Sequence, residues 1–224
     1  MLESKPVTNG PIAIQSQPAC HDTLPWIISF SLGVARAVCQ EPNRKLTMTT
    51  QSSTIPPDDL QRNLALARPN EDQTLSHIGL AGDTYTILLT GDDTAGRYCL
   101  IDMLVPPGGG PPPHRHDFEE MFTILEGEIE FTFRGAKSVV RAGETANIPA
   151  NAPHQFRNSS ERSARLLCMC SPAGQEEYFM AVGVPVASRV SPPPKLDEAA
   201  QAALKAKAEG LASQYRTEFL HPPV

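Results

Sequence analysis

The sequence between residues 78 and 184 consists of short runs of β-branched and aromatic residues, separated by glycine or proline about every eight to twelve residues. In the clearest run, residues 128–134, charged or threonine side chains alternate with apolar ones. Such alternation gives a strand one buried and one solvated face. About eight short strands of this kind predict an all-β jelly-roll barrel. The expected strands are residues 85–89, 98–105, 119–125, 128–134, 145–148, 155–157, 164–170 and 176–181.

The region before the barrel has a different character. Residues 1–57 are expected to form a disordered leader, because residues 1–47 show no sustained periodicity and contain scattered prolines. The change of composition at Met48 suggests that translation can start there. Residues 58–77 are expected to form a short helical or irregular lead-in, because leucines recur after a Pro-Pro-Asp entry. The barrel itself is expected over residues 78–188.

The tail, residues 189–224, begins with a proline-rich linker and then becomes rich in alanine, lysine and glutamate. Its apolar positions recur at three- and four-residue steps, which predicts an amphipathic helix that packs on the barrel or on a second subunit. These positions are Leu196, Ala200, Leu204, Ala208, Leu211 and Tyr215.

Charge and composition exclude several classes of protein. A net charge of −6 lacks the basic surplus on which binding to a phosphate backbone depends, so a general nucleic-acid binder is not expected. The apolar stretch at residues 24–39 contains Arg36 and is shorter than the roughly 20 residues of a membrane-spanning helix. Five cysteines without a CxxC pair favour a reducing, cytoplasmic location. Cys168 and Cys170 are expected to face the same side of one strand as small packed hydrophobic residues.

A metal-site pattern lies within the predicted barrel. His114, His116 and Glu120 are separated by even offsets, so on one extended strand region all three point to the same face. Two imidazoles and a carboxylate form the facial set that binds first-row divalent metals with open coordination positions. His154, which follows a proline-containing turn, brings a third imidazole. The expected cofactor is one divalent ion, and iron, manganese, nickel, cobalt, copper and zinc all suit these ligands.

These residues resemble the cupin superfamily. The first cupin motif is matched by Gly108, His114, His116, Glu120 and Gly127, and the second by Gly143, Pro149, His154 and Asn158. Asn151 stands where the family has glycine. Asparagine tolerates a positive φ better than most residues, so we expect the turn to be kept. Within the superfamily the chain is most similar to bacterial single-barrel proteins called quercetin-dioxygenase-like.

The resemblance implies a cupin barrel that binds a metal through His114, His116, Glu120 and His154, with Glu120 acting both as ligand and as catalytic proton acceptor. The implied activity is a dioxygenase that acts on a small enolic or flavonol-like compound, with dioxygen as the second substrate. Two alternatives remain: an oxygen-independent isomerase, decarboxylase or lyase, and a non-catalytic module that binds a small molecule or a metal. Pairing through edge strands predicts a homodimer.

Overall fold

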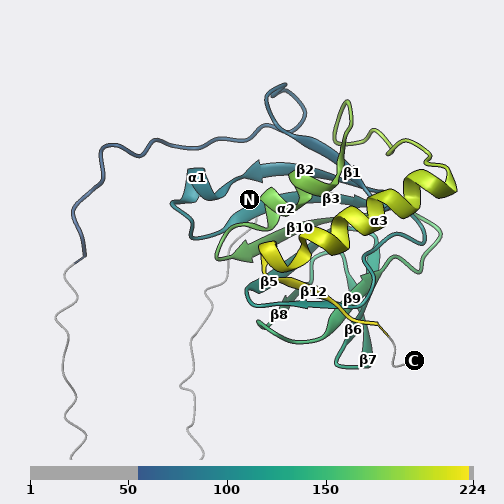
Figure 1. Cartoon of the computed structure of the whole chain (residues 1–224). Coiled ribbons are helices and arrows are strands. Elements are labelled where there is room, and N and C mark those ends of the chain that lie inside the picture. The colour runs from purple at the N-terminus through teal and green to yellow at the C-terminus, as the bar shows by residue number, and fades with distance from the viewer. Residues whose placement is uncertain (1–54, 222–224) are drawn as a thin grey trace, which may run out of the picture. The chain divides into compact units, whose positions relative to one another are not determined.

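Two antiparallel sheets packed against each other form the centre of the computed structural model, which describes residues 55–221 (Figure 1). From Pro57 onward these residues belong to one compact unit. The seven-stranded sheet contains, in spatial order, β11 (Val184–Pro185), β1 (His77–Leu80), β2 (Asp83–Leu89), β3 (Cys99–Val105), β10 (Ala164–Ser171), β5 (Glu119–Glu126) and β8 (Thr145–Ile148). The five-stranded sheet contains β12 (Thr217–Phe219), β4 (His114–His116), β9 (His154–Arg157), β6 (Glu128–Phe133) and β7 (Ala136–Arg141). The predicted all-β fold is therefore confirmed.

The core lies between the two sheets and follows from the alternation seen in the sequence. In β10 every second residue is buried, and these residues face the inner side chains of β3 and β5. Phe122 of β5 packs across the core against Phe131 of β6 and Phe156 of β9, with ring centroids 5.2 and 5.4 Å away. Burial of such a side chain contributes about 1.5–3 kcal/mol to folding, which explains why these aromatic positions join the sheets.

The strand predicted at residues 176–181 is wrong, because these residues form helix α2 (Gln175–Val182). A short apolar run does not distinguish strand from helix by periodicity alone. Local polar contacts stabilise the helix. The Glu176 carboxylate accepts hydrogen bonds from the backbone N–H groups of Gly91 and Gly174, at 2.6 and 2.8 Å. Gly91 begins the short helix α1 (Gly91–Thr94). Glu176 thereby joins the starts of both helices.

The helix considered for the lead-in is absent over residues 55–76 of the structure, which are irregular until β1 begins. The reason is that Leu60, Leu64 and Leu66 are 83%, 88% and 56% exposed. A short helix is marginal in water unless it buries an apolar face, and these leucines leave most of their surface exposed. The predictions about the leader and a start at Met48 concern mainly residues 1–54, which lie outside the described residues.

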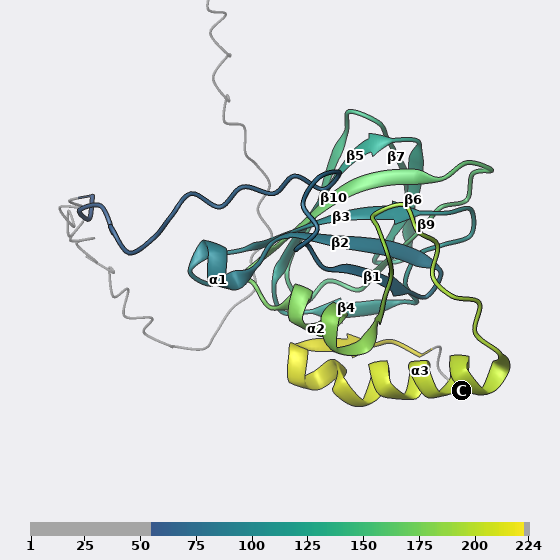
Figure 2. The same cartoon turned by 90° about the horizontal axis from the view of Figure 1, so that it is seen from above.

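The predicted C-terminal helix is confirmed as α3 (Glu198–Ala212), which begins where the Asp197 side chain accepts a hydrogen bond from the N–H of Ala200 at 2.8 Å. Figure 2 shows α3 beside α2, and the Tyr178 hydroxyl of α2 donates to the carbonyl of Ala208 at 2.9 Å. After a 3-10 turn, η1 (Ser213–Tyr215), the chain returns to the barrel as β12, a strand that the sequence did not predict. None of the helices in residues 55–221 is long and apolar enough to cross a lipid bilayer.

Candidate metal centre

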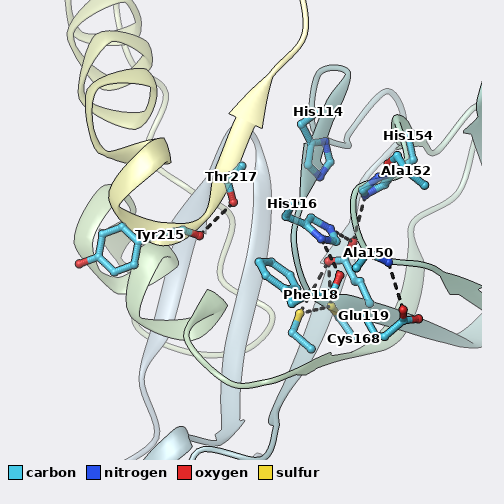
Figure 3. A network of polar contacts seen from close by, with 12 residues as sticks. His114, His116, Phe118, Glu119, Ala150, Ala152, His154, Cys168, Tyr215 and Thr217 are labelled. Atoms are coloured by element: carbon cyan, nitrogen blue, oxygen red, sulfur yellow. Dashed lines mark hydrogen bonds and ion pairs between the residues drawn. The ribbon is translucent and has the colours of Figure 1, made fainter.

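Three strands bring the predicted ligands together. His114 and His116 lie on β4, Glu120 lies on β5 and His154 lies on β9. Figure 3 shows the imidazoles of His114, His116 and His154 close together. All four are buried, and one ligand atom from each lies within 4.8 Å of the others. Three imidazoles and one carboxylate at this spacing could hold one divalent ion. We therefore treat this cluster as the candidate metal centre.

The expectation that His114, His116 and Glu120 share one strand is wrong. The chain leaves β4 at His116 and enters β5 at Glu119, and these two strands belong to different sheets. The three side chains still lie close together, because the inner faces of both sheets line the same interior.

The backbone around the ligands is fixed by pairing on both sides of β4. His114 pairs with His154 of β9, whereas His116 pairs with Thr217 of β12. The turn before His154 contacts the same strand, since the N–H of Asn151 donates to the carbonyl of His116 at 2.6 Å. Asn151 has a φ of 67°, so the expectation that asparagine keeps the turn of the glycine motif is confirmed.

Each of the three imidazoles is held by a backbone carbonyl. The Nδ1 atoms of His114, His116 and His154 lie 2.9 Å from the carbonyl oxygens of Pro112, Phe118 and Ala152 respectively. A carbonyl oxygen only accepts hydrogen bonds, so each Nδ1 must carry the proton. The Nε2 atoms are then the ring nitrogens available to a metal ion. Metal-binding histidines typically have this arrangement, in which the second nitrogen fixes the tautomer.

The Glu120 carboxylate faces two of these nitrogens. Its Oε2 atom lies 3.0 Å from Nε2 of His116 and 3.2 Å from Nε2 of His154. Burial acts to raise the pKa of Glu120, but the two imidazoles outweigh burial and hold this pKa below its ordinary value, so the group is anionic. Burial, reinforced by His154, lowers the pKa of His114 to about 4 and keeps this ring neutral. Three imidazole nitrogens and a buried carboxylate are donors that a first-row divalent metal binds, so these residues fit such an ion.

Two thiols complete the surroundings of Glu120. The Sγ atoms of Cys168 and Cys170 lie 3.3 and 3.8 Å from the other carboxylate oxygen, Oε1, and 3.6 Å from each other. Burial raises the pKa of Cys168 to about 12, so the thiol is protonated and donates. The two side chains share one face of a strand, as predicted, but their polar contact with Glu120 was missed. Only the pairing of β10 with β5, which places Cys170 opposite Glu120, reveals it.

Glu119 points away from the centre, as its alternation with Glu120 predicts. Its carboxylate is exposed and accepts hydrogen bonds from the Asn147 side chain at 2.8 Å and from the N–H of Ala150 at 3.1 Å. These bonds hold the turn that leads to His154. Glu119 therefore supports the backbone near the site from outside the barrel.

Comparison with known proteins gives a family for the central part of the chain. The sequence profile described as "Cupin domain" matches residues 101–170. Quercetin 2,3-dioxygenase of Bacillus subtilis (strain 168) is 28% identical over 109 residues, which cover 48% of this chain and 32% of that protein. Endoribonuclease YbeY of Myxococcus xanthus (strain DK1622) is 30% identical over 88 residues, which cover 39% of this chain and 29% of that protein. The chain thus spans about a third of the length of these two relatives.

Among solved structures, KdgF from Halomonas sp. superimposes with a TM-score of 0.45 and 15% identity, over 51% of this chain and 99% of that one. The two sequence relatives have unrelated names, a dioxygenase and an endoribonuclease. Similarity alone therefore does not identify the reaction, which has to be inferred from the chemistry of the site.

Proposed function

The chain belongs to the cupin superfamily, and on this basis we propose that it is a metal-dependent dioxygenase of the quercetin 2,3-dioxygenase type, acting on a small enolic or flavonol-like compound. The observation that carries the proposal is the donor set: three Nε2 nitrogens and one carboxylate, all buried and close together. His114, His116, Glu120 and His154 would hold one divalent ion. Four protein ligands leave an octahedral ion with open positions for a substrate.

When bound, the ion would supply Lewis-acid stabilisation of a substrate enolate beside dioxygen. The protein's own contribution is to orient the metal ligands and to move a proton. The backbone carbonyls of Pro112, Phe118 and Ala152 fix the three imidazoles before any ligand arrives, so little reorganisation is needed. Burial of the ligand side chains keeps bulk water away from the reacting centre.

Glu120 is the proposed general base, because it is the anionic group in the donor set and lies within reach of any hydroxyl bound there.

The experiment that tests this proposal combines elemental analysis of the purified protein with oxygen-electrode assays on flavonols and other enediol compounds. Near-stoichiometric metal that is lost in His114→Ala, together with oxygen uptake, would support the dioxygenase. Turnover without oxygen would favour an isomerase, decarboxylase or lyase, and tight ligand binding without a product would favour a binding module. Absence of metal under every loading condition would refute the metal-dependent function.

A homodimer remains part of the proposal. Light scattering coupled to size-exclusion chromatography measures the mass in solution, and a strict monomer would contradict it.

A further inference from the structure

The two oxygens of the Glu120 carboxylate have different environments. Oε2 faces the imidazoles of His116 and His154, whereas Oε1 faces the thiols of Cys168 and Cys170. Glu120 is 4% exposed, so water does not compete freely for either oxygen. The orientation of the carboxylate therefore depends on these protein groups.

Strand pairing produces this arrangement. Across β3, β10 and β5, Cys99 pairs with Cys170, and Cys170 pairs with Glu120. Cys168 lies two residues before Cys170 on β10 and therefore on the same face, toward the interior. The thiols and the carboxylate consequently form one contiguous polar patch on the inner face of the seven-stranded sheet. Cys99, one strand further from Glu120, is equally buried at 0% exposure.

A packing role alone does not account for the position of Cys168. Its Sγ lies 3.3 Å from Oε1 with the geometry of a donor, whereas a side chain that only filled space would have no reason to point a polar hydrogen at an anion. Hydrogen bonds to a charged acceptor are the stronger ones, and groups that orient a metal-binding carboxylate influence metal affinity. Cys170, at 3.8 Å, makes the longer and weaker of the two contacts.

We propose that Cys168, assisted by Cys170, is a positioning residue that holds Oε1 of Glu120 through an S–H hydrogen bond and thereby presents Oε2 to the space between the imidazoles. This inference rests on the proposed metal-dependent function, because it concerns the ligand carboxylate of that site. Cys168 would then be a hydrogen-bond donor to Oε1 of Glu120 that lies outside the motif of histidine and glutamate ligands.

The test compares three single variants by chelator competition for Co²⁺ and by the visible spectrum of the Co²⁺ protein. Cys168→Ala should weaken Co²⁺ binding about tenfold and should shift the spectrum. Removing a group that orients a metal ligand typically lowers metal affinity by about 10- to 100-fold, and we expect the lower end of that range. Cys168→Ser keeps a donor and should restore most of the affinity and of the spectrum. Leu166→Ala is the control, since it opens a buried gap on the same face of β10, opposite Ile124 of β5, and should lower stability while leaving both readouts unchanged.

A second measurement uses the metal-free protein. The infrared S–H stretch of Cys168, assigned by its loss in Cys168→Ala, should move upward in Glu120→Gln, because the anionic acceptor is lost. Wild-type affinity and spectrum in Cys168→Ala, with only thermal stability reduced, would overturn the inference and leave the metal site intact. Failure of the wild-type protein to bind Co²⁺ would instead refute the proposed function and, with it, the positioning role.

Discussion

The ring of Phe118 lies face to face with the ring of His116, with centroids 3.8 Å apart and an angle of 3° between the planes. The carbonyl of Phe118 also accepts the Nδ1–H of the same histidine at 2.9 Å. One residue therefore fixes both the plane and the tautomer of a candidate ligand. The side chain supplies the first constraint and the backbone supplies the second, so a substitution can separate them.

Phe118→Leu keeps the carbonyl but removes the stacked ring. We expect a metal affinity about tenfold lower, since the imidazole is less well oriented, and a free energy of unfolding lower by about 1–3 kcal/mol. Chelator competition and urea unfolding measure the two quantities. Phe131→Leu is the control, because that buried ring packs on Phe122 and Phe156 and should lower stability without changing metal affinity. Equal metal affinities for wild type and Phe118→Leu would show that stacking does not orient His116.

Glu120→Gln preserves shape but removes the negative charge from the donor set. We expect a metal-loaded protein, once formed, to lose about 10²- to 10⁴-fold in turnover, the usual contribution of a general base, while its circular dichroism stays native. Glu119→Gln is the matched control on the neighbouring residue, whose carboxylate faces outward to Asn147 and Ala150. Full activity of metal-loaded Glu120→Gln would rule out the proton-transfer role.

Much of the site could be predicted because its residues lie in short motifs, yet the reasoning that placed them on one strand was wrong. Even offsets put His114, His116 and Glu120 on one face, but the chain crosses between sheets after His116. The thiols could not be assigned to Glu120 from the sequence. Their contact depends on the pairing of β10 with β5, which brings together residues about 50 positions apart in the sequence.

The secondary structure was likewise predictable only where the local pattern determines it. The alternating pattern of residues 128–134 predicted β6 correctly, since one face is buried and the other solvated. The run at 176–181 has no such alternation, and its helix depends on capping contacts between Glu176 and Gly91, 85 residues away. Strand β12 was missed because three residues are too few to show a period.

Asn151 occupies the left-handed region with a φ of 67° and donates its N–H to the carbonyl of His116. Asn151→Gly should change the free energy of unfolding by less than about 1 kcal/mol, because glycine adopts this conformation without steric cost. Asn151→Ala should lower it by about 1–2 kcal/mol, the cost of a left-handed conformation for an ordinary residue. Urea unfolding measures both. Equal stabilities of the alanine and glycine variants would mean that the turn relaxes to another conformation.

Asp83 makes stability depend on pH. Burial raises the pKa of this carboxyl to about 7, against the opposing effects of hydrogen bonds from the Tyr85 hydroxyl and the N–H of Gly110. Its ordinary pKa is 3.8, so the folded state binds the proton more tightly than the unfolded state. The stabilising contribution is complete below about pH 4 and is lost as the pH rises through about 7, by at most about 1.4 kcal/mol per pH unit.

Asp83→Asn removes this titration. Urea unfolding of the metal-free proteins between about pH 5 and pH 8 should show wild type losing stability relative to Asp83→Asn as the pH rises. Tyr85→Phe should move the loss to higher pH, because the hydroxyl normally stabilises the carboxylate. A constant difference between wild type and Asp83→Asn across this range would show that Asp83 has an ordinary pKa.

Strand β12 covers the free side of the strand that carries two ligands, with Thr217 opposite His116 and Phe219 opposite His114. Deletion of residues 216–224 should leave β4 as a sheet edge, so that the backbone of both histidines becomes more mobile. We expect metal affinity to fall about tenfold and the melting temperature to fall as well. Chelator competition and thermal unfolding measure these effects.

Glu218→Ala separates backbone pairing from side-chain contacts in the same strand. It removes the ion pair between Arg115 and Glu218 at 2.6 Å, whose side chains are 47% and 57% exposed. Such surface pairs contribute less than about 1 kcal/mol, so metal affinity and melting temperature should stay near the wild-type values. If Glu218→Ala weakens metal binding as much as the deletion does, the ion pair and not the strand supports β4. If the deletion leaves affinity unchanged, the ligand strand is held by β9 alone through the pairing of His114 with His154.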